Sequence, residues 1–340
     1  MGEGNMRKYL DSIAKVVGAG CLAASLAASP ALSADNLKVT LNWLPDNSSI
    51  GIIYADALGY YKDAGIDLEI EPGKGSGVTS QLVAAGSTDV GLANGPSAIG
   101  VAAKGAPIKI IAPIYQTSEL GIISLEDTPI SGPKDLEGKT IFMAPGASVI
   151  PLFDAVVKVN GLDKSKINIF SGSGSAVLGL LAEKKVDAAL EAPSALMMPL
   201  EKQGIKTKIM FFRDVGVNVV GMSLIAQDQK IQKNPDLYKR FVDATLRGLA
   251  ATVKNPEAAV DALRSRYPDA QEKSELMEEL TKYIIPTICA KGATGLGKAP
   301  ADLWASTGEV LTQSLGSLGD GGIESKYTDA VLPAQLPPCP

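Results

Sequence analysis

Hydrophobic and polar positions alternate in two different ways along the chain, and together they predict an α/β protein. Short runs such as residues 37–43 (LKVTLNW) have the two-residue alternation of strands, whereas residues 50–64 have apolar positions three or four apart, as helices do. Gly65 ends that helix, since glycine commonly follows the last helical turn. The strands that the pattern predicts in the first part of the chain are 37–43, 66–71, 109–113, 121–125 and 139–143.

One stretch of the chain occurs twice. Residues 68–110 and residues 167–210 have the same order: a β-like run, a Gly/Ser-rich turn, a helix, an apolar run opened by aspartate, and a Pro-Ser-Ala triplet before a further helix. The opening residues, Asp89 and Asp187, lie 98 positions apart, and this offset changes little along the two copies. The repeat therefore predicts two similar lobes.

The Gly/Ser-rich turns of the repeat indicate where a ligand would bind. Residues 73–77 and 171–175 each follow a strand and precede a helix. In an open α/β sheet, ligands bind beyond the carboxyl ends of the strands, near free amides at helix N-termini. Either turn alone fits an ordinary connection, but because they form a matched pair we expect a ligand cleft between two facing lobes.

The order of the segments sets the expected domain boundaries. A second α/β unit begins at Lys139, and we expect the chain to cross between the lobes near Leu125 and near Gly221. From Asn234 onward the apolar spacing is helical, and we expect these helices to pack on the outside of the first lobe. The expected parts are a signal peptide (1–33), lobe 1 (34–125 and 222–332), lobe 2 (126–221) and a tail (333–340).

Composition narrows the class of protein. The chain has 340 residues, of which 46% are hydrophobic, and this is enough for two cores. Its net charge of −5 and the lack of a basic stripe argue against nucleic acid as a partner. After residue 33, no apolar run reaches the length of about 18 residues that a membrane span requires.

The N-terminus has the pattern of a secretory signal peptide. Arg7 and Lys8 precede an Ala-rich apolar run at 16–32, and the small residues at its end place the expected cleavage after Ser33. Lipid attachment at Cys21 is the weaker alternative, since the residues before it fit a lipobox poorly. We therefore expect export to the periplasm, as a monomer.

The residues that most enzymes of this size rely on are missing. The chain contains no histidine, which excludes Ser-His-Asp and Cys-His nucleophiles and most zinc sites. It also lacks a G-x-x-x-x-G-K-[ST] phosphate loop and the glycine spacing of a dinucleotide site. We therefore expect a binding protein without a metal or cofactor. A hydrolase or lyase with paired carboxylates is the alternative, because no motif around Glu71, Glu119 or Glu191 decides their role.

Removal of the signal peptide leaves two cysteines, Cys289 and Cys339. In an oxidising compartment they can form one disulfide that ties the end of the chain to the body of the protein. Cys339 lies in a Pro-rich segment, so an unpaired cysteine in a disordered tail fits the sequence nearly as well. Neither alternative is catalytic.

Five short segments carry a resemblance to a known family. They are 41–45 (LNWLP), 59–69 (GYYKDAGIDLE), 75–77 (GSG), 135–139 (DLEGK) and 187–191 (DAALE). They resemble periplasmic substrate-binding proteins of ABC importers, in the group for nitrate, sulfonates, taurine and thiamine-pyrimidine precursors, and the resemblance extends over about residues 36 to 330. It implies a two-lobed type II periplasmic binding protein fold that closes on a small molecule and delivers it to a membrane permease.

Relatives with the implied fold include enzymes. The resemblance implies that a pyrimidine synthase among them depends on histidine and a cysteine cluster, and a desulfinase on cysteine and histidine. This chain has neither set, so we expect no enzymatic activity. A sensor that hands its ligand-bound form to a receptor fits the sequence as well as transport does.

The candidate ligand contacts lie at the ends of predicted strands and in the turns that follow. Trp43 is expected to stack on a flat ligand, as the matching aromatic does in the pyrimidine-binding relatives, and the alternative is a core tryptophan. Asp46 and the serines fit helix N-caps equally well, and Glu191 fits either N–H donors of a ligand or an exposed surface. The full set is Asn42, Trp43, Asp46, Gly75, Ser76, Asn94, Tyr115, Ser148, Ser173, Glu191 and Asn218.

Arginine usage bears on the charge of the ligand. After residue 33 the first arginine is Arg213, and the others fall in the helices from residue 234 onward. Arginine is the usual partner of planar anions such as carboxylate or sulfonate. We therefore prefer a neutral or cationic pyrimidine-like heterocycle, with a sulfonate, nitrate or aromatic carboxylate as the alternative.

Overall fold

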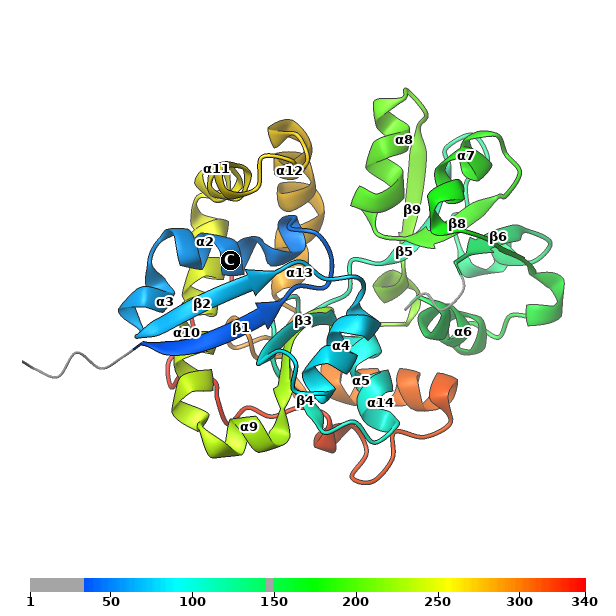
Figure 1. The fold of residues 1–340 in the computed structure, drawn as a ribbon. Coiled ribbons are helices and arrows are strands. Elements are labelled where there is room, and N and C mark those ends of the chain that lie inside the picture. Colours follow the sequence, from blue (N-terminus) through cyan, green and yellow to red (C-terminus); the bar gives the residue numbers. More distant parts are fainter. Residues whose placement is uncertain (1–33, 145–148) are drawn as a thin grey trace, which may run out of the picture. The chain divides into compact units, whose positions relative to one another are not determined.

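The computed structural model describes residues 34–144 and 149–340. The expected signal peptide, with Cys21, and the candidate contact Ser148 lie outside the described residues. The described chain contains two five-stranded sheets, each at the centre of one lobe (Figure 1). Lobe 1 is the lobe built on the sheet that contains Asp35–Thr40, and lobe 2 is the lobe built on the other sheet. The predicted α/β architecture with two lobes is confirmed.

The lobe 1 sheet contains one antiparallel strand among parallel ones. Its strands are β1 (Asp35–Thr40), β2 (Ile66–Glu71), β3 (Val90–Asn94), β4 (Ile108–Pro113) and β10 (Met222–Gln227). They lie in the order β2-β1-β3-β10-β4, and β10 runs antiparallel to both of its neighbours. The carboxyl ends of β1 and β3 therefore meet at one edge of the sheet.

The lobe 2 sheet has the same topology. Its strands are β5 (Gly121–Leu125), β6 (Thr140–Met143), β7 (Asn168–Ser171), β8 (Ala188–Glu191) and β9 (Thr207–Phe211). The order is β7-β6-β8-β5-β9, and β5 is the antiparallel strand. Each strand has a counterpart in lobe 1, with β6 matching β1 and β5 matching β10. The repeat predicts the matches of β7, β8 and β9 with β2, β3 and β4, whereas the match of β5 with β10 was not predicted.

Helices cover both faces of each sheet. Those of lobe 1 and the C-terminal region are α2 (Ile50–Ala57), α3 (Tyr60–Asp63), α4 (Ser76–Ala84), α5 (Gly95–Ala103), α9 (Asp228–Lys233), α10 (Pro235–Lys254), α11 (Pro256–Arg266), α12 (Lys273–Glu279), the π-helix η7 (Leu280–Ile284), α13 (Ile285–Ile288) and α14 (Ala301–Leu315). Those of lobe 2 are α6 (Ile150–Val159), α7 (Val177–Ala182), the π-helix η5 (Pro193–Met197) and α8 (Met198–Lys202). Single 3₁₀ turns are η1 (Asn47–Ser49), η2 (Pro133–Leu136), η3 (Lys164–Lys166), η4 (Gly174–Ala176), η6 (Phe212–Val215) and η8 (Ile323–Ser325).

The hydrophobic cores lie between these helices and the sheets. In lobe 1, α2 packs with α10 and α11 on one face of the sheet, and α4 and α5 cover the other. Tyr61 stacks on Phe241 with 5.4 Å between ring centroids, and its hydroxyl lies 2.7 Å from Thr245 Oγ1. In lobe 2, α6 covers one face, and α7 and α8 cover the other.

The chain crosses between the lobes at residues 114–120, the first crossing, and at residues 212–221, the second crossing. The expected position of the first crossing, near Leu125, is wrong, because β5 pairs with β8 and β9 of lobe 2. Every residue of β5 is buried, so its sequence fits the middle of either sheet equally well.

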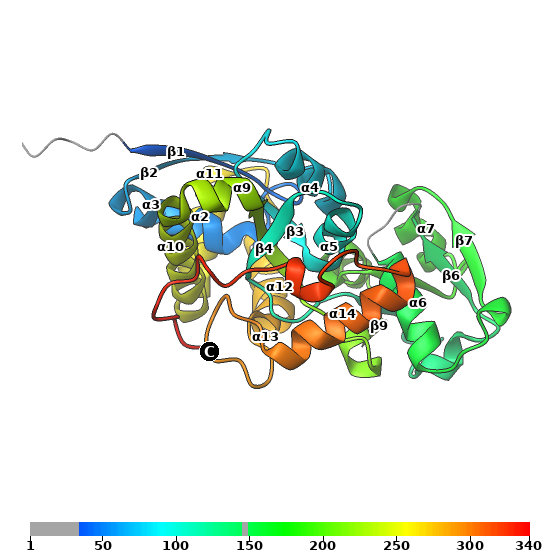
Figure 2. The same ribbon diagram turned by 90° about the horizontal axis from the view of Figure 1, so that it is seen from below.

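The C-terminal helices do not all pack on the outside of lobe 1, as we expected from the sequence. Helix α14 contacts α6 of lobe 2 as well as α5 of lobe 1 (Figure 2). Val310 of α14 belongs to the core of lobe 2. Ser306 Oγ donates to the carbonyl oxygen of Asn218 at 2.7 Å, and Val220 N–H donates to Thr307 Oγ1 at 3.1 Å. Helix α14 therefore anchors the second crossing.

The end of the chain is bound to lobe 1 rather than free. Cys289 and Cys339 form a disulfide, which decides between the two alternatives that the sequence left open. Ile110 N–H donates to the carbonyl oxygen of Lys326, and Thr328 N–H donates to that of Ile110, both at 2.9 Å. Residues 326–328 therefore pack along the edge strand β4, and the segment expected as a tail is held by the disulfide and by Leu296 N–H, which donates to the carbonyl oxygen of Pro337 at 2.9 Å.

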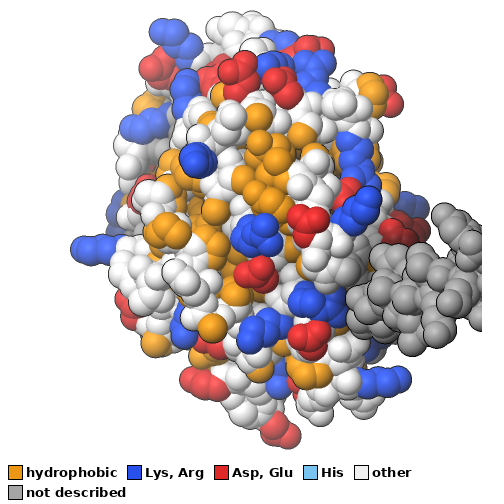
Figure 3. Space-filling view, turned by 90° about the vertical axis from the view of Figure 1, so that its left-hand side faces the viewer, with side chains coloured by type: hydrophobic (Ala, Val, Ile, Leu, Met, Phe, Trp, Pro, Cys, Tyr) orange, Lys and Arg blue, Asp and Glu red, His pale blue; other side chains and the backbone are white. Residues whose placement is uncertain are grey.

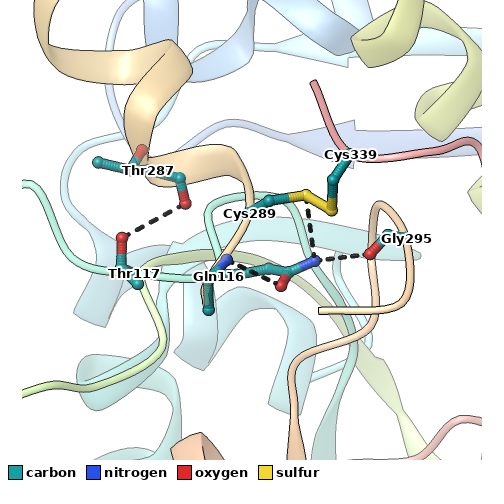
Figure 4. Close-up of a disulfide and its surroundings, with 7 residues drawn as sticks. Gln116, Thr117, Thr287, Cys289, Gly295 and Cys339 are labelled. Atoms are coloured by element: carbon teal, nitrogen blue, oxygen red, sulfur yellow. Dashed lines mark hydrogen bonds between the residues drawn. A yellow bond between two sulfur atoms is a disulfide. The ribbon is translucent and has the colours of Figure 1, made fainter. Parts of the chain in front are cut away.

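The disulfide lies beside the first crossing (Figure 4). The side-chain amide of Gln116 donates to the carbonyl oxygen of Gly295 at 2.7 Å, and Ala290 N–H donates to Gln116 Oε1 at 3.1 Å. Thr117 N–H donates to the carbonyl oxygen of Thr287 at 3.1 Å. The first crossing is thus held by the segment that the disulfide ties down.

Charges are mixed on the face of lobe 1 that lies at the left of Figure 1. Lysine and arginine alternate with aspartate and glutamate around a central apolar area, without a stripe of one sign (Figure 3). In the part of the chain that the structure describes, no helix combines the length and the apolar character needed to cross a membrane.

Candidate functional site

A cavity of about 790 Å³ lies between the two lobes. Its lining comes from lobe 1, from lobe 2 and from the first crossing, so a molecule inside it contacts all three. A cavity of this size can bury most of the surface of a small organic molecule. The lining residues are Asn42, Trp43, Asp46, Ser48, Gly75, Ser76, Tyr115, Glu119, Leu120, Val149, Gly174, Ser175, Val177, Glu191, Ala192, Ser194, Ala195, Met222, Glu279 and Ile284.

The lobe 1 wall is built on the turn that follows β2. Gly73 N–H donates to the carbonyl oxygen of Trp43 at 2.9 Å, and Gly75 N–H donates to that of Asn42 at 2.8 Å. A Cβ at Gly73 would lie 1.9 Å from the carbonyl oxygen of Leu41, so only glycine allows the two segments to approach this closely. The turn therefore fixes the backbone that carries Trp43.

Trp43 lines the cavity with a large aromatic surface. Its side chain is 53% exposed, so it is not the core tryptophan that the sequence left as an alternative. Indole rings stack on flat aromatic groups and attract cations over their faces. Trp43 therefore offers a site for a planar or positively charged group.

Asp46 is at once a helix cap and part of the cavity wall. Its Oδ1 accepts a hydrogen bond from Ser48 N–H at 2.8 Å and lies 2.5 Å from the Ser48 hydroxyl. The same hydroxyl lies 2.9 Å from Asn42 Oδ1. Burial raises the pKa of Asp46, and the two hydrogen bonds from Ser48 partly oppose this increase.

The residues at the ends of β3 and β4 differ in their access to the cavity. Asn94 is buried outside the lining, and its N–H donates to Ser76 Oγ at 3.0 Å. Tyr115 lines the cavity, and its hydroxyl donates to the carbonyl oxygen of Asn47 at 2.8 Å. Asn94 therefore supports Ser76, whereas Tyr115 presents its ring.

The lobe 2 wall carries a carboxylate where the matching strand of lobe 1 ends in an amide. Strand β8 ends at Glu191, whereas β3 ends at Asn94. Glu191 ends β8, its Oε1 accepts a hydrogen bond from Ala192 N–H at 3.1 Å, and burial raises its pKa. Ser194 follows in η5. The hydroxyls of Ser173 and Ser175 lie 2.8 Å apart, but of these two only Ser175 lines the cavity.

Glu119 brings a buried carboxylate to the cavity from the first crossing. Its side chain is 7% exposed, and its Oε2 has no hydrogen-bond partner among the described residues. Burial raises the pKa of Glu119 to about 7; the nearby Arg213 opposes this shift, whereas Asp46 and Glu191 add to it. An unpartnered buried carboxylate is costly unless a ligand supplies a donor or a positive charge.

Glu279 reaches the cavity from the end of α12. Its Oε2 accepts a hydrogen bond from Asn47 Nδ2 at 2.8 Å. Burial raises its pKa to about 7, and hydrogen bonds from Ser194 and Asn47 oppose this shift. The C-terminal end of α12 therefore lies at the cavity, which the expectation that these helices pack on the outside of lobe 1 did not include.

Among the described residues that line the cavity, four are carboxylates and none is lysine or arginine. The guanidinium of Arg213, which affects Glu119 from outside the lining, donates to the carbonyl oxygen of Ser118 at 2.9 Å and lies 3.8 Å from the ring centroid of Phe211. Within the described ranges, no three acidic or cysteine side chains lie close enough to hold a metal ion. The cavity is therefore an acidic site with an aromatic wall.

Lobe 2 also touches lobe 1 beside the cavity. Lys202 of α8 forms an ion pair with Glu275 of α12. The Tyr283 hydroxyl lies 4.0 Å from Met197 Sδ. These contacts join α8 to α12 and η5 to η7, so the two walls of the cavity meet along this side.

The structure brings most of the candidate contacts into one cavity: Asn42, Trp43, Asp46, Gly75, Ser76, Tyr115 and Glu191 line it. Asn94, Ser173 and Asn218 do not, because Asn94 lies behind Ser76, Ser173 points to Ser175, and Asn218 packs under α14. Sequence reasoning missed Glu119 as a contact, and Glu279 and Ser194 entirely. The repeated Pro-Ser-Ala triplet could have indicated Ser194 as a lining residue, because it directly follows the strand end at Glu191. No local motif indicates Glu279.

Comparison with known proteins places the chain in a family. The sequence model described as NMT1/THI5 like matches residues 46–259. The riboflavin-binding protein RibY of Chloroflexus aurantiacus is 24% identical over 324 residues, covering 92% of this chain and 91% of that protein. The 4-amino-5-hydroxymethyl-2-methylpyrimidine phosphate synthase of Legionella pneumophila is 26% identical over 264 residues, covering 75% of this chain and 81% of the synthase.

Solved structures share the fold. The periplasmic aliphatic sulphonate binding protein SsuA of Escherichia coli superposes with a TM-score of 0.70 at 16% identity, over 89% of this chain and 94% of SsuA. A ligand-binding component of an ABC-type import system from Staphylococcus aureus gives a TM-score of 0.66 at 14% identity, over 87% and 97% of the two chains. The fold is therefore that of the periplasmic binding proteins, as the sequence resemblance implied.

Proposed function

The chain belongs to the NMT1/THI5-like family, and from this membership and the geometry of its cavity we propose that it is the substrate-binding protein of an ABC importer. It captures one small organic molecule between its lobes outside the cytoplasmic membrane and delivers it to a permease. The observation that carries this proposal is the cavity of about 790 Å³ lined from both lobes and from the first crossing. A ligand that touches all three stabilises the closed arrangement of the lobes.

The ligand class follows from the lining. Trp43 presents an exposed indole, and Ser76, Ser175 and Ser194 provide hydroxyls around it. A flat heterocycle with polar substituents matches this combination. The relatives named for riboflavin and for a pyrimidine phosphate both handle such heterocycles, and we propose a pyrimidine-like heterocycle as the ligand.

An enzymatic role is the second candidate, because a relative is named as a synthase. The chain has no histidine, and Cys289 and Cys339 are joined in a disulfide. General base and thiol chemistry of the kind that histidine and cysteine supply is therefore missing from the cavity wall. Binding without turnover accounts for the site with the residues that are present.

The test is native mass spectrometry of the purified protein, followed by a melting screen. The screen contains riboflavin, hydroxymethylpyrimidine, nitrate, taurine and an aliphatic sulfonate. A ligand at about a hundred times its dissociation constant adds roughly 2.7 kcal/mol to the free energy of unfolding and raises the melting temperature by several degrees.

We expect a one-to-one complex with a heterocycle that is recovered unchanged. Chemical conversion of the bound compound would contradict the assignment as a binding protein. If only taurine or the sulfonate raises the melting temperature, the role in transport would stand, but the proposal of a heterocyclic ligand would be contradicted. No complex with any compound, as purified or after addition, would contradict the proposal as a whole.

A further inference from the structure

The distribution of charge in the cavity constrains its ligand more than the shape does. Asp46, Glu119, Glu191 and Glu279 line one cavity, and none of the described residues that line it is lysine or arginine; Arg213 acts on Glu119 from outside the lining. Each additional like charge in such a space raises the free energy of ionising the others. The cavity therefore holds negative charge, or protons, that the described residues of its lining do not neutralise.

The four carboxylates are not equally available to a ligand. Asp46 is occupied as the cap of η1, and Glu279 accepts a hydrogen bond from Asn47. One oxygen of Glu191 accepts from Ala192. Glu119 is different, because its Oε2 is buried without a partner among the described residues although the side chain lines the cavity. Glu119 Oε2 is therefore the buried carboxylate oxygen left without a partner among the described residues, and Glu191 offers its second oxygen from lobe 2.

We propose that the ligand carries a positive charge on or beside an aromatic ring, and that Glu119 and Glu191 hold this charge while Trp43 stacks on the ring. This inference rests on the proposed function and specifies the charge class of its ligand. Glu119 belongs to the first crossing and Glu191 to lobe 2, whereas Trp43 belongs to lobe 1. One cation thus links the three parts of the protein that must come together on closure.

The geometry disfavours the other ways to neutralise the site. A metal ion would require three or more carboxylates close together, and in the described part of the chain none are grouped in that way. An anion would face four carboxylates without a basic residue in the lining. A flat cation gains the charge-assisted hydrogen bonds of the carboxylates and the attraction of the indole face.

The proposal predicts how binding depends on pH. The groups that surround Glu119 are Asp46, Glu191, Glu279 and Tyr115 in the lining, with Arg213 outside it. Burial raises the pKa of Glu119 to about 7 in the empty protein, and a bound cation lowers it again. Cation binding therefore releases protons, and affinity rises from pH 6 to pH 8. A neutral ligand that accepts a hydrogen bond from a protonated carboxyl shows the opposite slope.

The experiment uses matched probes that differ in charge. One series is the ring-methylated nicotinamide cation, neutral nicotinamide and anionic nicotinate. The other is an aminomethylpyrimidine, its N-formyl derivative and the corresponding pyrimidine carboxylate. Spermidine serves as a cation without a ring. Affinities are measured by calorimetry at pH 6 and pH 8, in two buffers with different ionisation enthalpies, so that proton release is counted directly.

We expect the cation of at least one series to bind at least tenfold more tightly than its neutral partner, and to release protons. Glu119→Gln keeps the shape of the side chain and should weaken cation binding roughly tenfold or more, while changing the affinity of the neutral partner less than about threefold. Glu309→Gln, on the exposed face of α14, removes the same charge outside the cavity and should leave every affinity unchanged.

Equal or tighter binding of a neutral or anionic probe would overturn the charge inference and leave the heterocycle-binding function standing. If spermidine binds and the ring compounds do not, the ligand is positively charged, as proposed, but the inference that it contains an aromatic ring would be overturned. No binding of any cation, or a cation affinity that is the same in Glu119→Gln, would overturn the inference.

Discussion

The two lobes share one topology but have different residues at the ends of matching strands. β3 ends at Asn94, which is buried and whose N–H bonds to Ser76. β8 ends at Glu191, whose carboxylate lines the cavity. The difference shows that the repeat supplies the scaffold, while single residues at equivalent positions supply the chemistry. Lobe 1 contributes Trp43 with Asp46 and Ser76, and lobe 2 contributes Glu191 with Ser175 and Ser194.

The Gly/Ser-rich turns of the two lobes make different contacts. In lobe 1, two main-chain hydrogen bonds and the close approach at Gly73 hold the turn. In lobe 2, the hydroxyls of Ser173 and Ser175 lie 2.8 Å apart, and a Cβ at Gly174 would meet no atom within 4 Å. A side chain at position 73 therefore collides with the backbone, whereas position 174 has room for one.

The largest expected effect on stability comes from the Cys289–Cys339 disulfide, which ties the end of the chain to lobe 1. Lobe 2 contains no disulfide, because the chain has no other cysteine after residue 33. Replacing Cys289 and Cys339 by serine opens a loop with a sequence separation of 50 residues, which should lower the free energy of unfolding by about 4 kcal/mol. The melting temperature, measured by calorimetry, should fall by roughly 8 °C. A change below about 2 °C would show that the disulfide adds little to the packing of the tail.

The next largest effect on stability compares the Gly/Ser-rich turns of the two lobes, residues 73–77 and 171–175. Gly73→Ala should destabilise the protein by about 3 kcal/mol and displace Trp43, because its Cβ would lie 1.9 Å from the carbonyl oxygen of Leu41. Gly174→Ala in lobe 2, where a Cβ would meet no atom within 4 Å, is the control and should change stability by less than about 0.5 kcal/mol. If urea unfolding gives the same loss of stability for Gly73→Ala and Gly174→Ala, the close backbone approach at Gly73 does not constrain the lobe 1 turn.

A smaller effect separates the exposed aromatic residues of the two lobes. Trp43→Ala should weaken binding of the heterocycle with the largest melting shift by roughly two- to tenfold, because it removes the stacking surface. Phe170→Ala in β7 removes an exposed ring outside the cavity lining and should leave affinity unchanged. Titration calorimetry distinguishes the two, and a loss in Phe170→Ala alone would place the ligand elsewhere.

The smallest effect concerns the contact between the lobes. Lys202→Glu replaces the ion pair with Glu275 by a like-charge pair and should weaken ligand affinity about two- to fivefold by opposing closure. Lys185→Glu breaks an exposed ion pair within lobe 2 and serves as the control. Identical affinities in both variants would show that the Lys202 contact does not contribute to closure.

The sequence predicted the fold better than it predicted the site. Strand β2 lies at the residues that the hydrophobic pattern indicates, and the repeat anticipated the shared topology of the lobes. The sheet to which β5 belongs was not predictable, because a fully buried strand fits either sheet. Hydrophobic periodicity describes one element at a time and does not say which sheet an element joins.

The parts of the site that follow a strand were predictable, and the parts that come from elsewhere were not. Trp43 ends the first predicted strand, and Glu191 ends β8 at the position that the repeat pairs with Asn94. Glu119 lies in a crossing segment, and Glu279 lies on a helix whose sequence fits any amphipathic surface helix. Their role depends on how distant segments pack together, which no local pattern records.

The most direct test of the account is a crystal structure of the protein with the heterocycle that gives the largest melting shift. The account predicts one unaltered molecule in the cavity, with its ring against Trp43 and polar contacts to Glu119 and Glu191. A molecule bound outside this cavity, or a chemically converted one inside it, would contradict the account.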